Sequence, residues 1–397
     1  MIQHEKTNRK ECGEELMLYL HIPFCVQKCK YCDFLSGAYD RTVRERYLRA
    51  LFREIRERSR EVGGLKRRVS SIFIGGGTPS VLEAEEIGEL MKEIRSCFCV
   101  TEDAEITMEC NPGTVDGEKL SGFHAAGINR LSIGLQSGNN RELELLGRIH
   151  TYENFLETYQ NAWRAGFRNL NVDLMNALPD QTLESWEKTL EKVLALVPAP
   201  QHISVYSLIL EEGTIFYGML QRGEFSGERA IPTEETDREM YAYTGKRLRE
   251  AGYHQYEISN YAAEHYECRH NCGYWTRKEY LGLGIGAASL IGDKRYSNTR
   301  DMEQYLENPL EGRETETLSS REEMEEFMFL GLRMNRGVDR QDFVKRFGNS
   351  PDEIYSGVIE KNVRDGLLAD DGRAIALTAK GRDLSNYVMA QFLLDEP

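Results

Sequence analysis

Three cysteines in one short segment are the residues of this sequence best suited to chemistry. Cys25, Cys29 and Cys32 follow the apolar run Tyr19–Phe24 with the spacing CxxxCxxC. Thiolates this close together can bind three irons of a four-iron, four-sulfur cluster, which leaves the fourth iron open to a substrate or cofactor. A structural zinc site or a redox pair is the alternative, but zinc motifs usually come as two spaced pairs and no second pair lies near this segment. The spacing therefore favours an iron–sulfur cluster.

The composition narrows the class of protein. The chain has 397 residues, of which 40% are apolar, enough for one large and one small domain. The formal net charge of −15 argues against nucleic acid as the main partner. Residues 1–15 are polar and charged, without the apolar core of a signal peptide, and no apolar run approaches the roughly 18 residues of a membrane span. We therefore expect a cytoplasmic protein with no membrane span.

Strand-like and helix-like segments alternate along most of the chain. Short apolar or β-branched runs predict strands at Met17–Ile22, Val69–Ile74, Glu105–Glu109, Arg130–Leu135, Asn169–Met175 and His202–Leu208. Amphipathic segments between them, such as Tyr47–Ile55, predict helices. Gly127, Gly166 and Gly252 each follow an alanine, and each is expected to end a helix just before a strand. This alternation predicts an α/β fold with a parallel sheet, open or closed.

The last quarter of the chain is predicted to form a separate domain. A polar stretch at 307–320 has the composition of a linker. Helical segments at Glu322–Leu332, Gln341–Phe347 and Pro351–Asp365 precede a short hairpin and a final helix, which is the order of a winged-helix-like domain. Residues 321–397 carry 11 basic against 15 acidic side chains. This acidic balance argues against DNA binding and favours a docking or lid role.

Residues that could hold a cofactor follow the ends of the predicted strands, where the active sites of parallel β/α barrels lie. They are Gly76, Gly77 and Thr78 after the second strand, Glu109 after the third, Gln136 and Arg148 after the fourth, and Asp173 at the end of the fifth. Glycines let the backbone approach a ligand closely, and an aspartate at a strand end can accept both hydroxyls of a ribose. Each residue alone is more often an ordinary turn or surface residue. Several in register after successive strands indicate one shared site.

The order of these motifs resembles the radical S-adenosylmethionine (SAM) superfamily, and within it the oxygen-independent coproporphyrinogen III oxidase group. The matching segments are Tyr-Leu-His-Ile-Pro-Phe-Cys at 19–25, Gly-Gly-Gly-Thr-Pro-Ser at 75–80, Leu-Gln-Ser at 135–137 and Asp-Leu-Met-Asn-Ala-Leu-Pro at 173–179. The resemblance covers residues 16–300, with a matching small C-terminal domain. It implies a tail at 1–15, a partial (β/α)6 TIM-type barrel at 16–245, a barrel extension at 246–306, the linker at 307–320, and a mainly helical, winged-helix-like domain at 321–397.

The resemblance also implies roles for the residues above. Cys25, Cys29 and Cys32 would hold a 4Fe-4S cluster whose open iron is chelated by the amino and carboxylate groups of SAM. Gly76, Gly77, Thr78, Glu109, Gln136, Arg148 and Asp173 would bind SAM, while Tyr19 and Tyr31 would cover the cluster and the adenine side. A reduced flavodoxin or ferredoxin would supply the electron if SAM is cleaved. No catalytic residue is assigned.

Two positions separate the oxidases from their relatives, the HemW-type heme chaperones. The oxidases have CxxxCxxCxC, whereas position 34, two residues after Cys32, is Phe34. His270-Asn271-Cys272-Gly273-Tyr274-Trp275 matches the HNxxYW signature of the HemW type, which carries the cluster but binds heme. Imidazole is a common axial ligand of heme iron, and Tyr274 and Trp275 could pack on a porphyrin face. The alternative is a histidine satisfied by local hydrogen bonds.

These features favour a heme chaperone that binds heme and a SAM-chelated cluster and delivers heme to respiratory acceptor proteins. One alternative is an oxygen-independent coproporphyrinogen III oxidase, which decarboxylates coproporphyrinogen III to protoporphyrinogen IX by radical SAM chemistry. Another is a radical SAM enzyme for some other substrate, because the sequence locates no porphyrin pocket. Cys268 and Cys272 bracket His270 and could form a second metal site or ligate heme, although their spacing matches no standard zinc or cluster pattern. The oligomeric state is open, and a homodimer is one option.

Overall fold

Six parallel strands form the centre of the molecule. The computed structural model describes residues 13–227 and 230–394. The strands are β1 (Glu15–Ile22), β2 (Arg68–Gly76), β3 (Cys99–Cys110), β4 (Arg130–Gln136), β5 (Leu170–Asn176) and β6 (His202–Ser207). They lie side by side in chain order, and each pairs in parallel with the next. The six strands predicted from the sequence are therefore confirmed.

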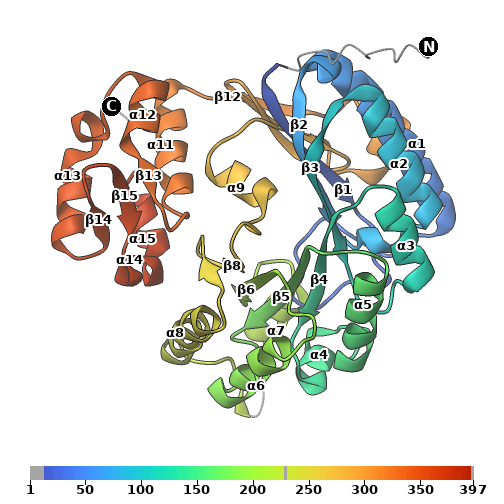
Figure 1. Cartoon of the computed structure of the whole chain (residues 1–397), viewed down its shortest axis with the longest axis horizontal. Coiled ribbons are helices and arrows are strands. Elements are labelled where there is room, and N and C mark those ends of the chain that lie inside the picture. The colour runs from blue at the N-terminus through green and yellow to red at the C-terminus, as the bar shows by residue number, and fades with distance from the viewer. Residues whose placement is uncertain (1–12, 228–229, 395–397) are drawn as a thin grey trace, which may run out of the picture.

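Helices connect these strands and cover the outer face of the sheet (Figure 1). They are α1 (Arg41–Glu61), α2 (Ala84–Cys97), α3 (Gly117–Ala125), α4 (Asn140–Leu146), α5 (Tyr152–Arg164), α6 (Leu183–Leu194), α7 (Ile215–Gln221) and α8 (Glu234–Glu250). Capping side chains set where several of them begin, since Asp40, Thr151 and Thr182 each accept a backbone N–H of the first turn. Parallel strands joined by outer helices in this order form the partial (β/α)6 barrel that was predicted.

The helix ends confirm the glycine pattern read from the sequence. Gly127, Gly166 and Gly252 adopt left-handed φ angles of 98°, 108° and 91° directly after α3, α5 and α8. An L side chain is strained in this conformation, so glycine is suited to each of these turns. The chain then enters β4, β5 or the strand that follows α8, as the alternation predicts.

Alternation along the strands separates the packed core from the inner, concave face. On β4, Leu131, Ile133 and Leu135 belong to the main hydrophobic core, whereas Arg130, Ser132, Gly134 and Gln136 line a cavity on the other face. Successive side chains of a strand point to opposite faces, which explains this division. Polar residues at every second position are thus collected on the inside of the barrel.

Further strands extend both edges of the sheet. The chain continues through β7 (His254–Gln255), β8 (Asn260–Ala262), α9 (Arg269–Trp275), β9 (Tyr280–Leu283), β10 (Ala288–Ile291), β11 (Lys294–Ser297), α10 (Met302–Glu307) and β12 (Glu314–Thr317). The full order is β12-β11-β10-β9-β1-β2-β3-β4-β5-β6-β8-β7, in which β9 pairs in parallel with β1. The stretch 307–320, predicted to be a linker, contains β12, which pairs with β11.

The C-terminal module has its own small core. It comprises α11 (Ser320–Gly331), β13 (Val338–Asp339), α12 (Arg340–Phe347), α13 (Pro351–Arg364), β14 (Leu368–Asp370), β15 (Ala374–Leu377), α14 (Ala379–Asp383) and α15 (Ser385–Ala390). Its strands form an antiparallel sheet, and a hydrophobic cluster separate from that of the barrel fills its centre. The predicted helices and hairpin are confirmed, with the last helix divided in two. No helix in the described part of the chain is long and apolar enough to cross a membrane.

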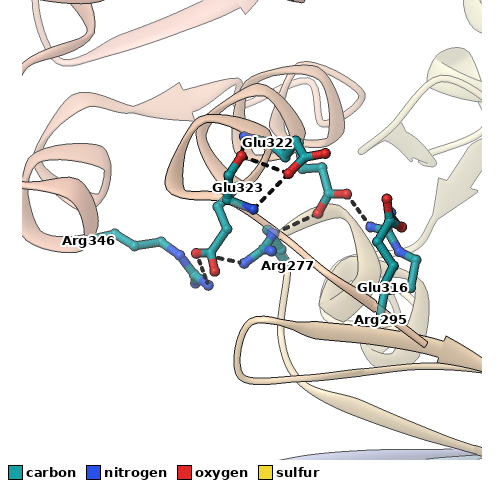
Figure 2. A network of polar contacts seen from close by, with 8 residues as sticks. Arg277, Arg295, Glu316, Glu322, Glu323 and Arg346 are labelled. Atoms are coloured by element: carbon teal, nitrogen blue, oxygen red, sulfur yellow. Dashed lines mark hydrogen bonds and ion pairs between the residues drawn. The ribbon is translucent and has the colours of Figure 1, made fainter.

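Ion pairs centred on one buried arginine join this module to the barrel (Figure 2). Arg277, which follows α9 and is 2% exposed, donates from Nε to Glu326 at 2.8 Å and from Nη1 to Glu323 at 3.2 Å. Arg346 of α12 lies 3.7 Å from the same Glu323 carboxylate, and Arg295 of β11 bonds to Glu326. Two glutamates of α11 therefore attach the module to Arg277 and Arg295 of the barrel.

Candidate functional site

A cavity of about 320 Å³ collects most of the predicted cofactor residues. Its lining includes Cys25, Cys29, Tyr31, Cys32, Gly76, Gly77, Thr78, Glu109, Gln136, Arg148 and Asp173, from the loops and strand ends of β1 to β5. Tyr19 lies outside this lining, with its ring 6.4 Å from that of Phe73 and its hydroxyl 3.1 Å from His21 Nδ1. We refer to this space as the cysteine cavity.

Backbone hydrogen bonds fix the cysteine loop. Cys25 N donates to Gly37 O at 2.9 Å, and Lys30 N donates to Leu146 O at 3.0 Å, which ties the loop to the end of α4. The three thiols are free and partly exposed. No three His, Cys, Asp or Glu side chains of the described residues converge on a single metal ion, whereas a cubane cluster takes thiolates spread around several irons. The donor set fits an iron–sulfur cluster.

The glycine turn packs directly against this loop. A Cβ at Gly77 would lie 2.7 Å from Phe24 O and 3.0 Å from Cys25 Sγ, and one at Gly76 would lie 2.7 Å from the ring of His21. Gly76 also has a φ of 116°, which L side chains rarely adopt. Only glycine fits here, so the turn forms a close wall beside the thiols.

The amides of this turn are engaged within the chain. Gly76 N donates to Glu109 Oε2 at 2.9 Å, and the amides of Gly77 and Thr78 donate to carbonyl oxygens of Ile22 and Phe24 at 2.8 and 2.7 Å. The sequence suggested that such amides could meet a carboxylate. The carboxylate that Gly76 meets in this structure is that of Glu109.

A chain of polar side chains links two of the cysteines. Thr78 Oγ1 lies 3.5 Å from Cys25 Sγ and accepts from Asn111 Nδ2 at 2.9 Å. Arg148 donates to Asn111 Oδ1 at 2.8 Å, and its other terminal nitrogen lies 3.7 Å from Cys29 Sγ. Donors placed beside sulfur stabilise the thiolate, the form that binds iron.

Two half-buried carboxyl groups, those of Glu109 and Asp173, face the same cavity. Asp173 accepts hydrogen bonds from Ser132 Oγ and Asn171 Nδ2, both at 2.8 Å. Burial raises the pKa of Asp173, and burial together with the nearby charge of Asp173 raises the pKa of Glu109 to about 8. A pair of desolvated carboxyls is suited to receive a cationic ligand.

Gln136 is held in an unusual backbone conformation at the end of β4. Its φ of 70° lies in the left-handed region, and the pairing of β4 with β5 shifts register between Gly134 and Gln136. A non-glycine residue in this region costs free energy and is found most often where surrounding structure imposes it, as at binding sites. The bulge turns the Gln136 side chain into the cysteine cavity.

The HNxxYW segment forms α9, but its histidine does not line the cysteine cavity. His270 is 1% exposed, its Nδ1 lies 2.9 Å from Ser71 Oγ, and its Nε2 lies 3.1 Å from the Tyr274 hydroxyl. Burial, and then the charge of Arg130, lower the pKa of His270 to about 3, so the imidazole is neutral at physiological pH. The histidine is thus satisfied by local hydrogen bonds, which was the alternative to a role as heme ligand.

Other residues of α9 face two different cavities. Asn271 lines the cysteine cavity, whereas Trp275 lines a second cavity at the C-terminal module. Glu105 of β3 holds the start of α9 by accepting Arg269 N at 3.0 Å and His270 N at 3.1 Å. The helix therefore separates the two cavities.

The two cysteines that bracket His270 lie in different surroundings. Cys268 is buried, with its Sγ 3.5 Å from Glu105 Oε1. Cys272 packs in a small apolar cluster with Tyr256, Ala262, Met334 and Trp275. Both lie beside Tyr256, whose hydroxyl accepts Cys268 N at 3.3 Å and which belongs to the cluster around Cys272.

Arg130 and Asn111 line the cysteine cavity without having been assigned from the sequence. Arg130 is 2% exposed, and its Nε has no hydrogen-bond partner among the described residues. Its signal in the sequence is the strand alternation itself, since Arg130 is in phase with Ser132 and Gln136. Asn111 directly follows β3, and only the fold shows that it joins Arg148 to Thr78.

Comparisons with known proteins agree with this architecture. A model of the radical SAM superfamily matches residues 19–193, and a model of the HemN C-terminal domain matches residues 318–384. A solved structure reported as "Coproporphyrinogen III oxidase (HemN) from Escherichia coli is a Radical SAM enzyme" is similar with a TM-score of 0.82 at 26% identity. It covers 96% of this chain and 90% of that chain.

Proteins related in sequence point to a narrower family than the superfamily model does. The protein named heme chaperone HemW of Bacillus subtilis (strain 168) is 36% identical over 380 residues, which is 94% of this chain and 98% of that protein. The heme chaperone HemW of Escherichia coli (strain K12) is 34% identical over 388 residues, again 98% of its length. From this similarity over nearly its whole length, the chain belongs to the HemW family of the radical SAM superfamily.

Proposed function

We propose that this protein is a heme chaperone, which binds heme and a SAM-chelated 4Fe-4S cluster and transfers heme to acceptor proteins. The observation that carries the proposal is Phe34, which lines the cysteine cavity with 60% of its surface exposed. The oxidases have a further cysteine at this place, and a phenyl ring offers neither a metal ligand nor a group that transfers a proton. The proteins named heme chaperone HemW of Bacillus subtilis and Escherichia coli match the chain along 98% of their length.

In this proposal the cysteine cavity holds both cofactors. Cys25, Cys29 and Cys32 would bind the cluster. The residues that would bind SAM are Tyr19, Tyr31, Gly76, Gly77, Thr78, Glu109, Gln136, Arg148 and Asp173. The bound cluster and SAM supply one-electron chemistry. Thr78 and Arg148 donate hydrogen bonds toward two of the thiolates. Glu109 and Asp173 supply the carboxyl groups that face a cationic ligand.

We assign heme binding to α9, through His270, Tyr274 and Trp275. Trp275 is the residue of the three that lines a cavity, and its indole can pack on a porphyrin face. His270 and Tyr274 bond to each other, and His270 also bonds to Ser71 of β2, which fixes the helix against the sheet. They are therefore positioning residues, and His270 Nε2 could reach iron only by giving up the Tyr274 hydroxyl.

The proposal also covers the compartment in which the protein acts and the proteins that it contacts. The protein would act in the cytoplasm, receive electrons from a reduced flavodoxin or ferredoxin, and deliver heme to respiratory proteins. The support for heme delivery is the similarity to the relatives named heme chaperone HemW.

Anaerobic reconstitution with iron and sulfide, followed by heme titration read by absorbance, tests the proposal. We expect a Soret band that saturates at one heme per chain and declines when an apoprotein acceptor is added. Absence of specific heme binding would contradict the proposal. The observation in support of the alternative, a coproporphyrinogen III oxidase, is the TM-score of 0.82 to the solved oxidase at 26% identity. Turnover of coproporphyrinogen III to protoporphyrinogen IX by the reconstituted protein would establish it.

A further inference from the structure

A second cavity, of about 760 Å³, lies between α9 and the C-terminal module. Trp275 and Thr276 line it from the barrel side, and residues of α11, α12 and the loops around β13 and β15 line it from the module. Its volume is in the range of about 300–1,000 Å³ typical of sites for small molecules and cofactors. We call it the interdomain cavity.

Contacts between the two parts hold this cavity in shape. Asn335, just before β13, donates from its backbone N to Tyr256 O at 2.9 Å and from Nδ2 to Gln255 O at 2.6 Å. The Arg333 guanidinium stands 4.3 Å from the Trp275 ring and does not line the cavity. Arg346 at the cavity wall is drawn toward Glu323 (Figure 2).

The apolar part of the wall suits a flat aromatic ligand. Trp275 supplies a ring surface from the barrel side and Phe327 one from the module, and Met334 and Val338 add aliphatic surface to the same wall. The Trp275 Nε1 atom is buried and has no hydrogen-bond partner in the described part of the chain. Aromatic side chains with a few polar groups are the usual lining of sites for planar cofactors.

The charged part of the wall contains both signs, but its acids are already used. Asp339 accepts the amides of Gln341 and Asp342 at 2.8 and 3.1 Å, and Asp371 accepts those of Arg373 and Ala374 at 2.8 and 2.7 Å. The third acid, Asp342, lies in the first turn of α12, where the helix dipole stabilises its charge.

Two of the four cations of the wall are paired and two are not. Arg373 lies 3.6 Å from Asp339, and Arg346 lies 3.7 Å from Glu323. Arg336 and Lys345 are exposed and form no ion pair with any of residues 13–227 or 230–394. These two cations can pair with an anionic ligand at this cavity. The attraction is local, because the chain as a whole carries a net charge of −15.

We propose that the interdomain cavity is the heme site, with the porphyrin against Trp275 and Phe327 and the two propionates on Arg336 and Lys345. This inference rests on the proposed heme function and gives it a place in the fold. The assignment follows from charge and shape, because heme is a flat aromatic ring that carries two carboxylates. The buried and doubly hydrogen-bonded His270 lies outside this cavity.

Heme and its dimethyl ester, titrated into the reconstituted full-length protein, test the assignment. The variant Arg336→Gln/Lys345→Gln removes both proposed partners of the propionates. We expect it to bind heme about tenfold more weakly than the wild type, as loss of two charge-assisted pairs predicts. The wild type should bind heme more tightly than the ester, and the variant should bind both about equally.

Arg364→Gln/Lys294→Gln is the matched control, because both side chains are exposed and neither lines a cavity named above. It should bind heme as the wild type does. If the wild type binds heme but the Arg336/Lys345 variant keeps its affinity and its preference over the ester, the interdomain site is overturned while the proposed function stands. If the wild type binds no heme specifically, both fail. Circular dichroism and iron content confirm that each variant is folded and loaded.

Discussion

His270 and Tyr274 are hydrogen-bonded to each other one turn apart on α9, with Nε2 3.1 Å from the tyrosine hydroxyl. The other ring nitrogen lies 2.9 Å from Ser71 Oγ of β2, and the imidazole packs 5.3 Å from the ring of Phe73. Both polar atoms of this neutral, buried histidine are thus occupied. The histidine fixes α9 against the sheet, and α9 in turn forms part of the wall of both cavities.

Replacing this histidine should affect stability more than heme ligation. His270→Ala leaves the Ser71 and Tyr274 hydroxyls without their partner and opens a hole beside Phe73, so the free energy of unfolding should fall by about 2–4 kcal/mol. Urea unfolding followed by circular dichroism measures this loss. At saturating heme the absorbance spectrum should keep the wild-type ligation pattern.

His265→Ala is the control for this variant, since His265 is exposed and its one ion pair among the described residues is with the exposed Glu264 at 3.6 Å. It should leave both the stability and the heme spectrum unchanged. A His270→Ala protein of wild-type stability whose Soret band loses the signature of imidazole ligation would show instead that His270 binds the iron.

The glycine turn predicts a variant that impairs cluster loading. A Cβ at Gly77 would meet the Phe24 carbonyl oxygen at 2.7 Å and Cys25 Sγ at 3.0 Å, and the backbone atom cannot move without displacing the cysteine loop. Gly77→Ala should therefore retain less iron and sulfide after reconstitution and lose about 1–3 kcal/mol of stability. Iron and sulfide analysis with the absorbance near the cluster bands checks the first effect.

Gly88 provides the control, because it lies inside α2 and an added Cβ would meet nothing within 4 Å. Gly88→Ala should keep the full cluster content and gain about 0.5–1 kcal/mol of stability. Equal iron content in the two variants would mean that the close approach at Gly77 is not needed for the cluster.

The sequence predicted the parallel core because its signals are local. Apolar β-branched runs mark β1 to β6, and glycines such as Gly127 and Gly166 mark the turns that lead into them. The cysteine loop and the strand-end residues then meet at one edge, since parallel strands point the same way. Their convergence in the cysteine cavity follows from this topology.

The placement of α9 could not be predicted in the same way. β9 joins β1 although more than 250 residues separate them, and such a pairing depends on the packed sheet rather than on local propensity. The bonds of His270 to Ser71 and of the α9 amides to Glu105 have the same long-range origin. A sequence motif alone therefore could not show that His270 is buried while Trp275 borders another cavity.

The raised pKa of Glu109 predicts that a proton is released when SAM binds. Its pKa of about 8 lies above the ordinary value of 4.5, so the group is largely protonated at pH 7. A cationic ligand in the cysteine cavity favours the charged carboxylate and expels the proton. Calorimetry at pH 7 in buffers of different ionisation enthalpy should show this release in the reconstituted wild type and not in Glu109→Gln.

The raised pKa of Glu109 also determines how the stability of the protein changes with pH. Because the folded pKa is raised, the contribution of Glu109 to stability is complete below about pH 4.5 and is lost as the pH rises through 8. Between these values the wild type should lose stability relative to Glu109→Gln. Glu118→Gln, at an exposed position of α3, should behave as the wild type in both measurements. Proton release that persists in Glu109→Gln would assign the proton to Asp173 or another group.

Ion pairs around Arg277 hold the C-terminal module to the barrel. Arg277 is buried between Glu323 and Glu326, and Glu326 is only 5% exposed. Arg277→Met would leave these carboxylates without their main partner, and breaking a buried pair in this way costs about 3–5 kcal/mol. We expect lower stability in urea and faster hydrogen exchange in α11, because this helix then loses its attachment to the barrel.

A second consequence follows for the interdomain cavity. Trp275 lies two residues before Arg277, and Arg346 shares Glu323 with it, so both walls of the cavity depend on this network. Arg277→Met should therefore weaken heme binding as well. Lys188→Met is the control, since it breaks the exposed pair with Glu184 and should change stability by less than about 0.5 kcal/mol. Wild-type exchange of α11 in Arg277→Met would mean that other contacts hold the module, such as those of Asn335 with Gln255 and Tyr256.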